Sequence, residues 1–263
     1  MKVREYGRSG PVVVLLHGGP GAPGYIAPLA RSLSDAFRVL EPFQRGSGSQ
    51  PLTVARHVED LHDLIEARSP AARPMLVGHS WGAMLGLAYA AAHPDRAAAL
   101  VLIGCGTFDS ESRRRLKAHI DERMDDDLRE RMARLDEIED RDERFTRMGP
   151  LLEEIYSFDR LEHDSEMERC DARAYEESSE DMARLQAAGI FPAAFAAIDI
   201  PVLMLHGAVD PHPGSMIRDS LAPHVSQLEY REWERCGHEP WLERAVRDDF
   251  LVTLRDWLTR HAH

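Results

Sequence analysis

Cysteine, lysine and long apolar runs are scarce in this chain of 263 residues. The three cysteines have neither metal-ligand nor CxxC spacing, which argues against a disulfide framework and favours small buried thiols in a reducing compartment. No run approaches the ~20 apolar residues of a membrane-spanning helix, and the N-terminal residues lead into no signal-peptide apolar region. We therefore expect a cytoplasmic protein that binds no membrane.

Positive charge is also in short supply. The 32 basic side chains, only two of them lysines, face 45 acidic ones, and the formal net charge is −13. Nucleic-acid binding needs clustered Lys and Arg to displace counterions, so we expect no nucleic-acid partner. Residues 108–185 carry 26 acidic and 15 basic side chains, whereas the rest of the chain carries 19 and 17. The excess acidity therefore belongs to one segment.

Short apolar runs typical of buried parallel strands recur along the chain. They are Val12–Leu16, Met75–Val77, Ala99–Ile103 and Val202–Leu205, with Gln227–Trp233 as a final strand. The helix-period stretches are Ile26–Phe37, Val54–Ala67, Trp81–Ala92 and about 241–260. Strands that alternate with helices predict right-handed crossovers and an α/β fold with a doubly wound, mostly parallel sheet.

Strand signals stop between residues 107 and 189. Apolar residues there recur at helical spacing within a highly charged sequence, for example at Leu128, Met132, Leu135 and Ile138. Because this pattern is too charged to build a deep core of its own, we expect a helical cap (lid) inserted at 107–189 that lies across the sheet. The core domain then comprises residues 1–106 and 190–263.

Gly78-His79-Ser80-Trp81-Gly82 follows a predicted buried strand and opens a predicted helix. That context is what a G-x-S-x-G nucleophile elbow requires, because a sharp strand-to-helix turn projects the serine hydroxyl and leaves no room for bulky neighbours. A chance match within an ordinary turn is the alternative. The flanking strand and helix favour Ser80 as a nucleophile.

A nucleophilic serine needs a base that is oriented by a third group. Asp210 follows one predicted strand and His238 follows the last one, so nucleophile, acid and histidine occur in the α/β-hydrolase order. We expect His238 to be the general base and Asp210 to orient it. His212 is close enough in sequence to be a further partner of Asp210, whereas packing or solvent roles are expected for the other histidines nearby: His57, His62 and His79.

The segment His17-Gly18-Gly19-Pro20-Gly21 follows the first predicted strand. Glycines allow the backbone to approach a substrate, and acyl transfer needs N–H donors for the developing oxyanion. We assign these donors to the N–H groups of Gly19 and Trp81. A dinucleotide-binding loop is disfavoured because the G-x-G-x-x-G spacing is absent and a proline interrupts the loop.

Together these motifs resemble α/β-hydrolase serine enzymes, and among them the proline iminopeptidases and their relatives. The similar segments are HGGPG at 17–21, QRGSGS at 44–49, GHSWG at 78–82 with LGLAYA at 85–90, HGAVD at 206–210 and GH at 237–238. The resemblance implies a Ser80, Asp210 and His238 triad, an oxyanion hole, no cofactor, and a lid. Phe43 replaces the aspartate usual in that subfamily, and the tail HEPWLE at 238–243 is closer to esterases and lactonases.

We therefore expect a serine hydrolase that cleaves a small ester or amide of a small-molecule or short-peptide substrate. It is either a proline iminopeptidase-like aminopeptidase or a carboxylesterase or lactonase without peptidase activity. A non-catalytic ligand-binding or signalling protein on the same fold is the alternative from another class. No metal site is expected, because no His or carboxylate cluster has ligand spacing.

The acidity of the lid permits two interpretations. A solvated helical surface with Arg–carboxylate pairs is the simpler one. Alternatively, some carboxylates face the active-site mouth and favour cationic substrates. The candidates for that role are Glu153, Glu154, Glu176 and Glu177.

Overall fold

A single seven-stranded sheet organises the computed structural model, which describes residues 1–70 and 72–262. The strand order is β1-β3-β2-β4-β5-β6-β7, with β1 antiparallel to β3 and every other pair parallel. This confirms the predicted doubly wound, mostly parallel sheet. The strands are β1 (Val3–Tyr6), β2 (Val12–Leu16), β3 (Arg38–Pro42), β4 (Met75–His79), β5 (Ala99–Ile103), β6 (Val202–Gly207) and β7 (Leu228–Trp233).

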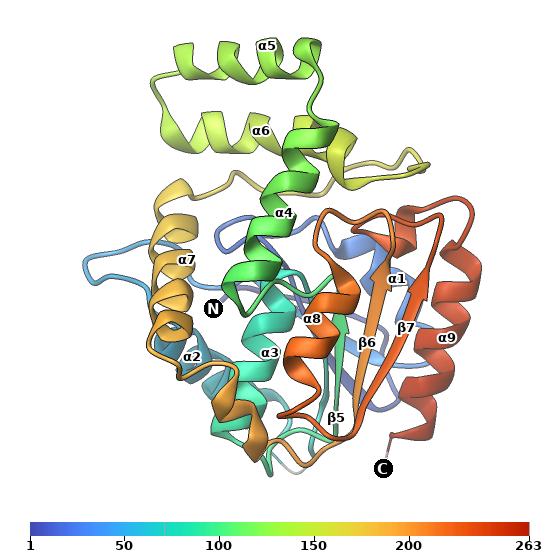
Figure 1. Cartoon of the computed structure of the whole chain (residues 1–263). Helices are drawn as coiled ribbons and strands as arrows, with labels where there is room; N and C mark the ends of the chain where they lie inside the picture. The colour runs from blue at the N-terminus through green and yellow to red at the C-terminus, as the bar shows by residue number, and fades with distance from the viewer. Residues whose placement is uncertain (71, 263) are drawn as a thin grey trace.

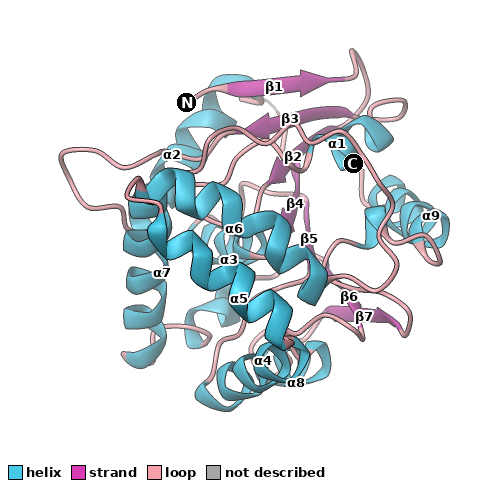
Figure 2. Cartoon of the chain, turned by 90° about the horizontal axis from the view of Figure 1, so that it is seen from above, coloured by secondary structure: helices cyan, strands magenta, loops and turns pink. Residues whose placement is uncertain are grey.

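Alternate residues of the central strands build two apolar cores, one on each face of the sheet. In β2, Val14 and Leu16 belong to one core, and Val13 and Leu15 to the other. Figure 2 shows the corresponding helices on the two sides of the sheet. The first core takes helices α2 (Val54–Arg68), α3 (Trp81–Ala92) and α8 (Gly214–Leu221), and the second takes α1 (Ala27–Leu33) and α9 (Arg247–Arg260). Burial on both faces explains why these strands are continuously apolar.

Several elements differ from the sequence prediction, among them β1 and α8, which it did not include. Arg38–Pro42 forms β3, although its mixed sequence shows no strand pattern. The last helix begins at Arg247 instead of about residue 241, because the chain first forms a 3₁₀ turn, η3 (Pro240–Leu242), and then turns at Glu243. The buried Glu243 carboxylate accepts three backbone N–H groups, from Gly237, Phe158 and Asp159.

Four helices lie between β5 and β6, within the segment 107–189 that we call the lid. They are α4 (Ser110–Arg123), α5 (Asp126–Arg134), α6 (Arg141–Tyr156) and α7 (Ala172–Ala187), with two 3₁₀ turns, η1 (Leu135–Glu137) and, beyond the lid, η2 (Ala193–Ala197). Helices α5 and α6 form the layer farthest from the sheet (Figure 1). Every lid helix begins at an aspartate that accepts backbone N–H groups: Asp109, Asp125, Asp140 and Asp171. Part of the acidic excess thus caps helices.

Carboxylates also fasten α7 to the core. Glu177 accepts the Leu52 N–H at 2.8 Å, and Asp181 accepts the Val54 N–H at 2.8 Å. Leu52 lies in the loop that leads into α2, and Val54 is the first residue of that helix. The contacts give two more acidic residues of the lid a structural role.

The three cysteines are free and buried, as the sequence predicts. Burial raises the pKa of the thiols, Cys170 included, which keeps them protonated and unreactive. Among the described residues, no helix has the length and apolarity needed to span a bilayer.

Candidate active site

Ser80 sits at a strained turn between β4 and α3. Its backbone angles are φ 53° and ψ −118°, and within residues 1–70 and 72–262 no other non-glycine residue has a positive φ. Such a conformation costs on the order of 1–3 kcal/mol and persists only where the surrounding structure imposes it. The predicted elbow is therefore present in the backbone.

Close packing around the elbow explains the two flanking glycines. A Cβ on Gly78 would lie 2.3 Å from the Gly82 carbonyl oxygen, and a Cβ on Gly82 would lie 2.2 Å from the Leu16 carbonyl oxygen. Neither distance is compatible with a side chain. The glycines of G-x-S-x-G let α3 begin directly against β2.

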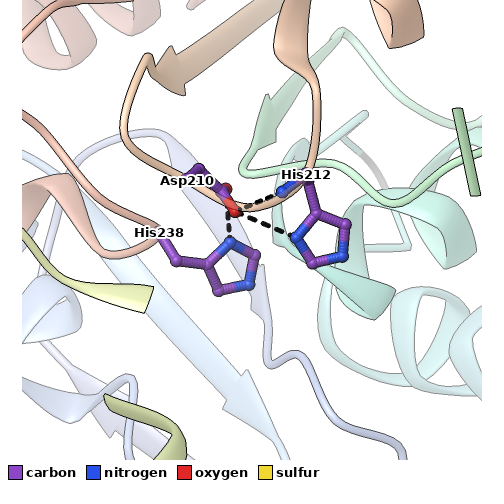
Figure 3. Close-up of side chains that lie close together, drawn as sticks. All are labelled: Asp210, His212 and His238. Atoms are coloured by element: carbon purple, nitrogen blue, oxygen red, sulfur yellow. Dashed lines mark hydrogen bonds and ion pairs between the residues drawn. The ribbon is translucent and has the colours of Figure 1, made fainter. Parts of the chain in front are cut away.

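The fold brings the predicted acid and base together. Asp210 follows β6 and His238 follows β7, and His238 Nδ1 lies 2.5 Å from Asp210 Oδ2 (Figure 3). The His238 backbone N–H donates to the Tyr156 carbonyl at 2.7 Å, which ties this loop to the lid. The predicted acid and base, 28 positions apart in the sequence, are thus in contact.

Burial and neighbouring charges shift the pKa values of this pair in opposite directions. Burial alone raises the pKa of the Asp210 carboxyl, but the His238 and His212 rings outweigh it and hold that pKa well below its usual value. Burial favours a neutral His238, but the Asp210 carboxylate prevails and raises the pKa of this ring above 6.5. Because an ionised carboxylate only accepts hydrogen bonds, His238 Nδ1 carries the proton and its Nε2 is the free base when the ring is neutral.

A second imidazole shares the same carboxylate. His212 Nδ1 lies 3.0 Å from Asp210 Oδ1, and the His212 backbone N–H donates to that oxygen at 2.9 Å. This is the partnership that the short spacing of the two residues suggested. Ligand atoms of Asp210, His212 and His238 all lie within 4.8 Å of one another, so the fold gathers potential metal ligands that sequence spacing does not reveal. Ordinary imidazole–carboxylate hydrogen bonds account for the cluster without a cation.

Ser80 and His238 face a common cavity of about 1200 Å³. Among the described residues no hydrogen bond joins the Ser80 hydroxyl to His238, and such contacts are often loose without substrate. The cavity is closed on one side by lid helices α4 and α6. Its lid walls include Leu116, Ile120, Leu152, Glu153 and Tyr156.

The loop after β2 meets the elbow at this cavity. Gly19 has φ +50° and lines the cavity, and neither its N–H nor that of Trp81 donates to another described residue. Gln44, which sequence reasoning missed, braces the two segments. It donates to the His17 carbonyl at 2.8 Å and accepts the Trp81 indole N–H at 2.7 Å. Its position in the QRGSGS motif is the sequence feature that could have indicated this role.

Comparison with known proteins identifies the family. A family model for the alpha/beta hydrolase fold matches residues 11–245. The chain belongs to the α/β-hydrolase fold family. The matched region begins just before β2 and ends between η3 and α9, so it contains all three residues of the predicted triad.

Curated relatives within the α/β-hydrolase family include proline iminopeptidases, which confirms the resemblance seen in the motifs. That of Neisseria meningitidis is 39% identical over 101 residues, covering 35% of this chain and 32% of the relative. The cis-3-alkyl-4-alkyloxetan-2-one decarboxylase of Shewanella oneidensis is 31% identical over 107 residues, covering 38% of this chain and 34% of the decarboxylase. The matched segments span about a third of the length of these relatives.

Solved structures of α/β-hydrolases match almost the whole chain. An esterase from Thermogutta terrifontis superimposes with a TM-score of 0.67 at 20% identity, covering 100% of this chain and 94% of the esterase. The enol-lactonase from Burkholderia xenovorans LB400 superimposes with a TM-score of 0.65 at 24% identity, covering 98% of this chain and 96% of the lactonase. At these identities the likeness shows the fold. The relatives are enzymes, in agreement with the prediction of an enzyme.

Proposed function

We propose that this protein is a serine hydrolase that cleaves a small ester or amide through an acyl-enzyme intermediate. The Asp210–His238 contact of 2.5 Å carries the proposal. It places the proton on His238 Nδ1 and leaves Nε2 as a base in the cavity that Ser80 also lines. Nucleophile, base and orienting acid are the parts that acyl transfer requires.

The chemistry proceeds in two halves. His238 Nε2 takes the proton of the Ser80 hydroxyl as its oxygen attacks the substrate carbonyl carbon, and the resulting imidazolium then protonates the leaving alcohol or amine. A water molecule, deprotonated by the same nitrogen, next attacks the acyl-serine ester. The carboxylic acid leaves and the Ser80 hydroxyl regains its proton.

The negative oxygen of each tetrahedral intermediate needs hydrogen-bond donors. We assign them to the N–H group of Gly19, in the loop after β2, and to that of Trp81, the first residue of α3. Their freedom from other acceptors among the described residues supports this role. Loss of one such donor costs about 10²–10³ in kcat in a well-studied protease.

Labelling with a fluorophosphonate probe tests the proposal. The wild-type protein should form a covalent adduct, Ser80→Ala should form none, and Ser157→Ala, which removes another cavity-lining hydroxyl, should react like the wild type. Adduct formation that persists in Ser80→Ala would overturn the assignment. Ligand binding without turnover of any ester, amide or lactone would instead support a non-catalytic binding protein.

A cavity carboxylate favours an aminopeptidase as the second candidate. Of the four lid glutamates considered from the sequence, Glu153 lines the cavity, whereas the other three pair elsewhere: Glu154 with Arg131, Glu176 with Arg141, and Glu177 with Arg173. Glu153 lies 3.0 Å from Arg160, which also contacts Glu239. Two carboxylates around one guanidinium leave a net negative charge that suits a substrate amine.

Parallel kinetics on two substrate sets separates the candidates. An aminopeptidase should hydrolyse proline or alanine arylamides. A carboxylesterase or lactonase should hydrolyse short acyl esters or lactones and show little arylamide activity. Ser80→Ala serves as the inactive control in both sets.

A further inference from the structure

A series of hydrogen bonds connects the loop after β2 to the loop after β7 through His79, the residue before Ser80. The Gly18 N–H donates to the Tyr25 hydroxyl at 2.7 Å, and this hydroxyl lies 2.5 Å from His79 Nδ1. His79 Nε2 lies 3.0 Å from the carbonyl oxygen of His238. These hydrogen bonds, which we call the relay, therefore join the loop after β2 to the loop that carries His238. The first of these loops, residues 17–21, is the candidate oxyanion loop, and the connection runs through His79, which precedes Ser80.

The two ends of the relay determine where each of its protons lies. A backbone N–H can only donate and a carbonyl can only accept, so the Tyr25 oxygen accepts from Gly18 and His79 Nε2 donates to His238. The His79 ring is buried, and burial holds its pKa well below 6.5, so it is neutral and its Nδ1 is bare. The Tyr25 hydroxyl must then donate to Nδ1. Burial raises the pKa of Tyr25 well above 10, which keeps that proton in place.

Tight packing surrounds these groups. A Cβ on Gly18 would lie 2.7 Å from both the Tyr25 hydroxyl oxygen and Ser80 Cβ. The His79 ring packs edge-on to Trp241, with centroids 4.8 Å apart, and lies 4.4 Å from the His238 ring. The relay thus occupies a close-packed wall of the cavity.

We propose that Tyr25 and His79 are positioning residues that hold the oxyanion loop and the His238 loop at a fixed separation across Ser80. This inference rests on the proposed hydrolase function. Strands β2 and β7 are separated in the sheet by β4, β5 and β6, so no ladder of strand hydrogen bonds sets the distance between their loops directly. The relay supplies that link with one hydroxyl and one neutral imidazole.

Tyr25→Phe removes the hydroxyl and keeps the ring. It leaves the Gly18 N–H without its acceptor and His79 Nδ1 without its donor, so the loop that carries the Gly19 N–H loosens. Small displacements of catalytic groups cost up to about 10² in rate. We expect kcat on the ester or amide that the wild type hydrolyses to fall by about ten- to hundredfold while KM changes less than threefold.

A matched control is Tyr89→Phe, which removes the hydroxyl of another buried tyrosine, on α3, that does not line the cavity. Its kcat should equal that of the wild type. A trifluoromethyl ketone, which forms an oxyanion on attack by serine, should lose affinity for Tyr25→Phe in proportion to kcat. Equal kcat and equal ketone affinity in Tyr25→Phe and Tyr89→Phe would overturn the positioning role.

Nitrogen-15 NMR of the wild-type histidines tests the relay without relying on activity. The His79 signals, identified by their absence in His79→Gln, should show a protonated Nε2 and a bare Nδ1, and the Nδ1 signal should shift in Tyr25→Phe. A His79 ring protonated on Nδ1 would overturn the relay even in a variant that folds poorly. Probe labelling that persists in Ser80→Ala would instead refute the hydrolase assignment. The NMR result for His79 does not depend on that outcome, so the two failures can be told apart.

Discussion

The His212 and His238 rings stack with centroids 4.9 Å apart and an interplanar angle of 15°, each bonded through Nδ1 to a different oxygen of Asp210. The Nε2 atoms of both rings lie away from the carboxylate (Figure 3). The carboxylate is therefore braced by one ring while it orients the other. His212 contributes to the site through Asp210.

Substitution of His212 should reduce kcat through this contact. His212→Phe keeps a stacked ring but removes the Nδ1 donor, and hydrogen bonds to charged groups contribute about 1.5–3 kcal/mol. We expect kcat to fall about tenfold or more with little change in KM. His212→Asn, whose amide can still donate to Asp210, should retain most of the activity. Equal kcat in both variants and the wild type would contradict this role.

The activity should depend on pH through His238. Only the neutral ring can accept the Ser80 proton, and Asp210 raises the pKa of this ring above 6.5. A plot of kcat/KM against pH should therefore rise with increasing pH through an apparent pKa above 6.5. A midpoint well below 6.5 for the wild type would show that another group controls the profile.

Asp210→Asn should lower kcat by about 10⁴, as the loss of the orienting acid does in a serine protease.

Glu243 should contribute to stability. Its buried carboxylate accepts the backbone N–H groups of Gly237, Phe158 and Asp159 at 2.8–2.9 Å, which joins the His238 loop to the end of α6. Glu243→Gln replaces an acceptor by an N–H donor and leaves a buried N–H unpaired, so the free energy of unfolding should fall by about 1–3 kcal/mol. Urea denaturation measures this change. The exposed Glu234→Gln is the control, expected within about 0.5 kcal/mol of the wild type.

Gly18 should tolerate no side chain. Gly18→Ala places a methyl group 2.7 Å from Ser80 Cβ and from the Tyr25 hydroxyl, so the loop must move away from the nucleophile. We expect loss of at least 99% of kcat/KM. A methyl group on Gly48 meets no atom within 4 Å, and Gly48→Ala should keep wild-type activity. Comparable activity of the two variants would refute the steric argument.

Glu153 provides a test of charge selection. If this carboxylate attracts a substrate amine, KM for an alanine arylamide should rise with salt, and Glu153→Gln should raise KM and weaken the salt dependence. Glu154→Gln is the matched control, because that neighbouring side chain pairs with Arg131. A KM that is independent of salt for the wild type would leave the lid acidity with its structural roles alone.

Much of the site follows from local sequence. The apolar strand runs, the glycines around Ser80 and the order of Ser80, Asp210 and His238 predicted both the sheet and a contact between acid and base. These features are readable because strand periodicity and elbow sterics depend on neighbours in the chain. In a parallel sheet, residues that follow the strands then gather at one edge.

The sequence by itself determined the fold class, the elbow and the residues proposed as the triad. Tertiary structure alone decided that Glu153, and not Glu154, faces the cavity, because helical periodicity identifies a face but not what packs against it. It likewise decided that Tyr25 and His79 join two loops from distant strands. Such contacts depend on the order of strands in the sheet and on close packing, which no local pattern of residues encodes.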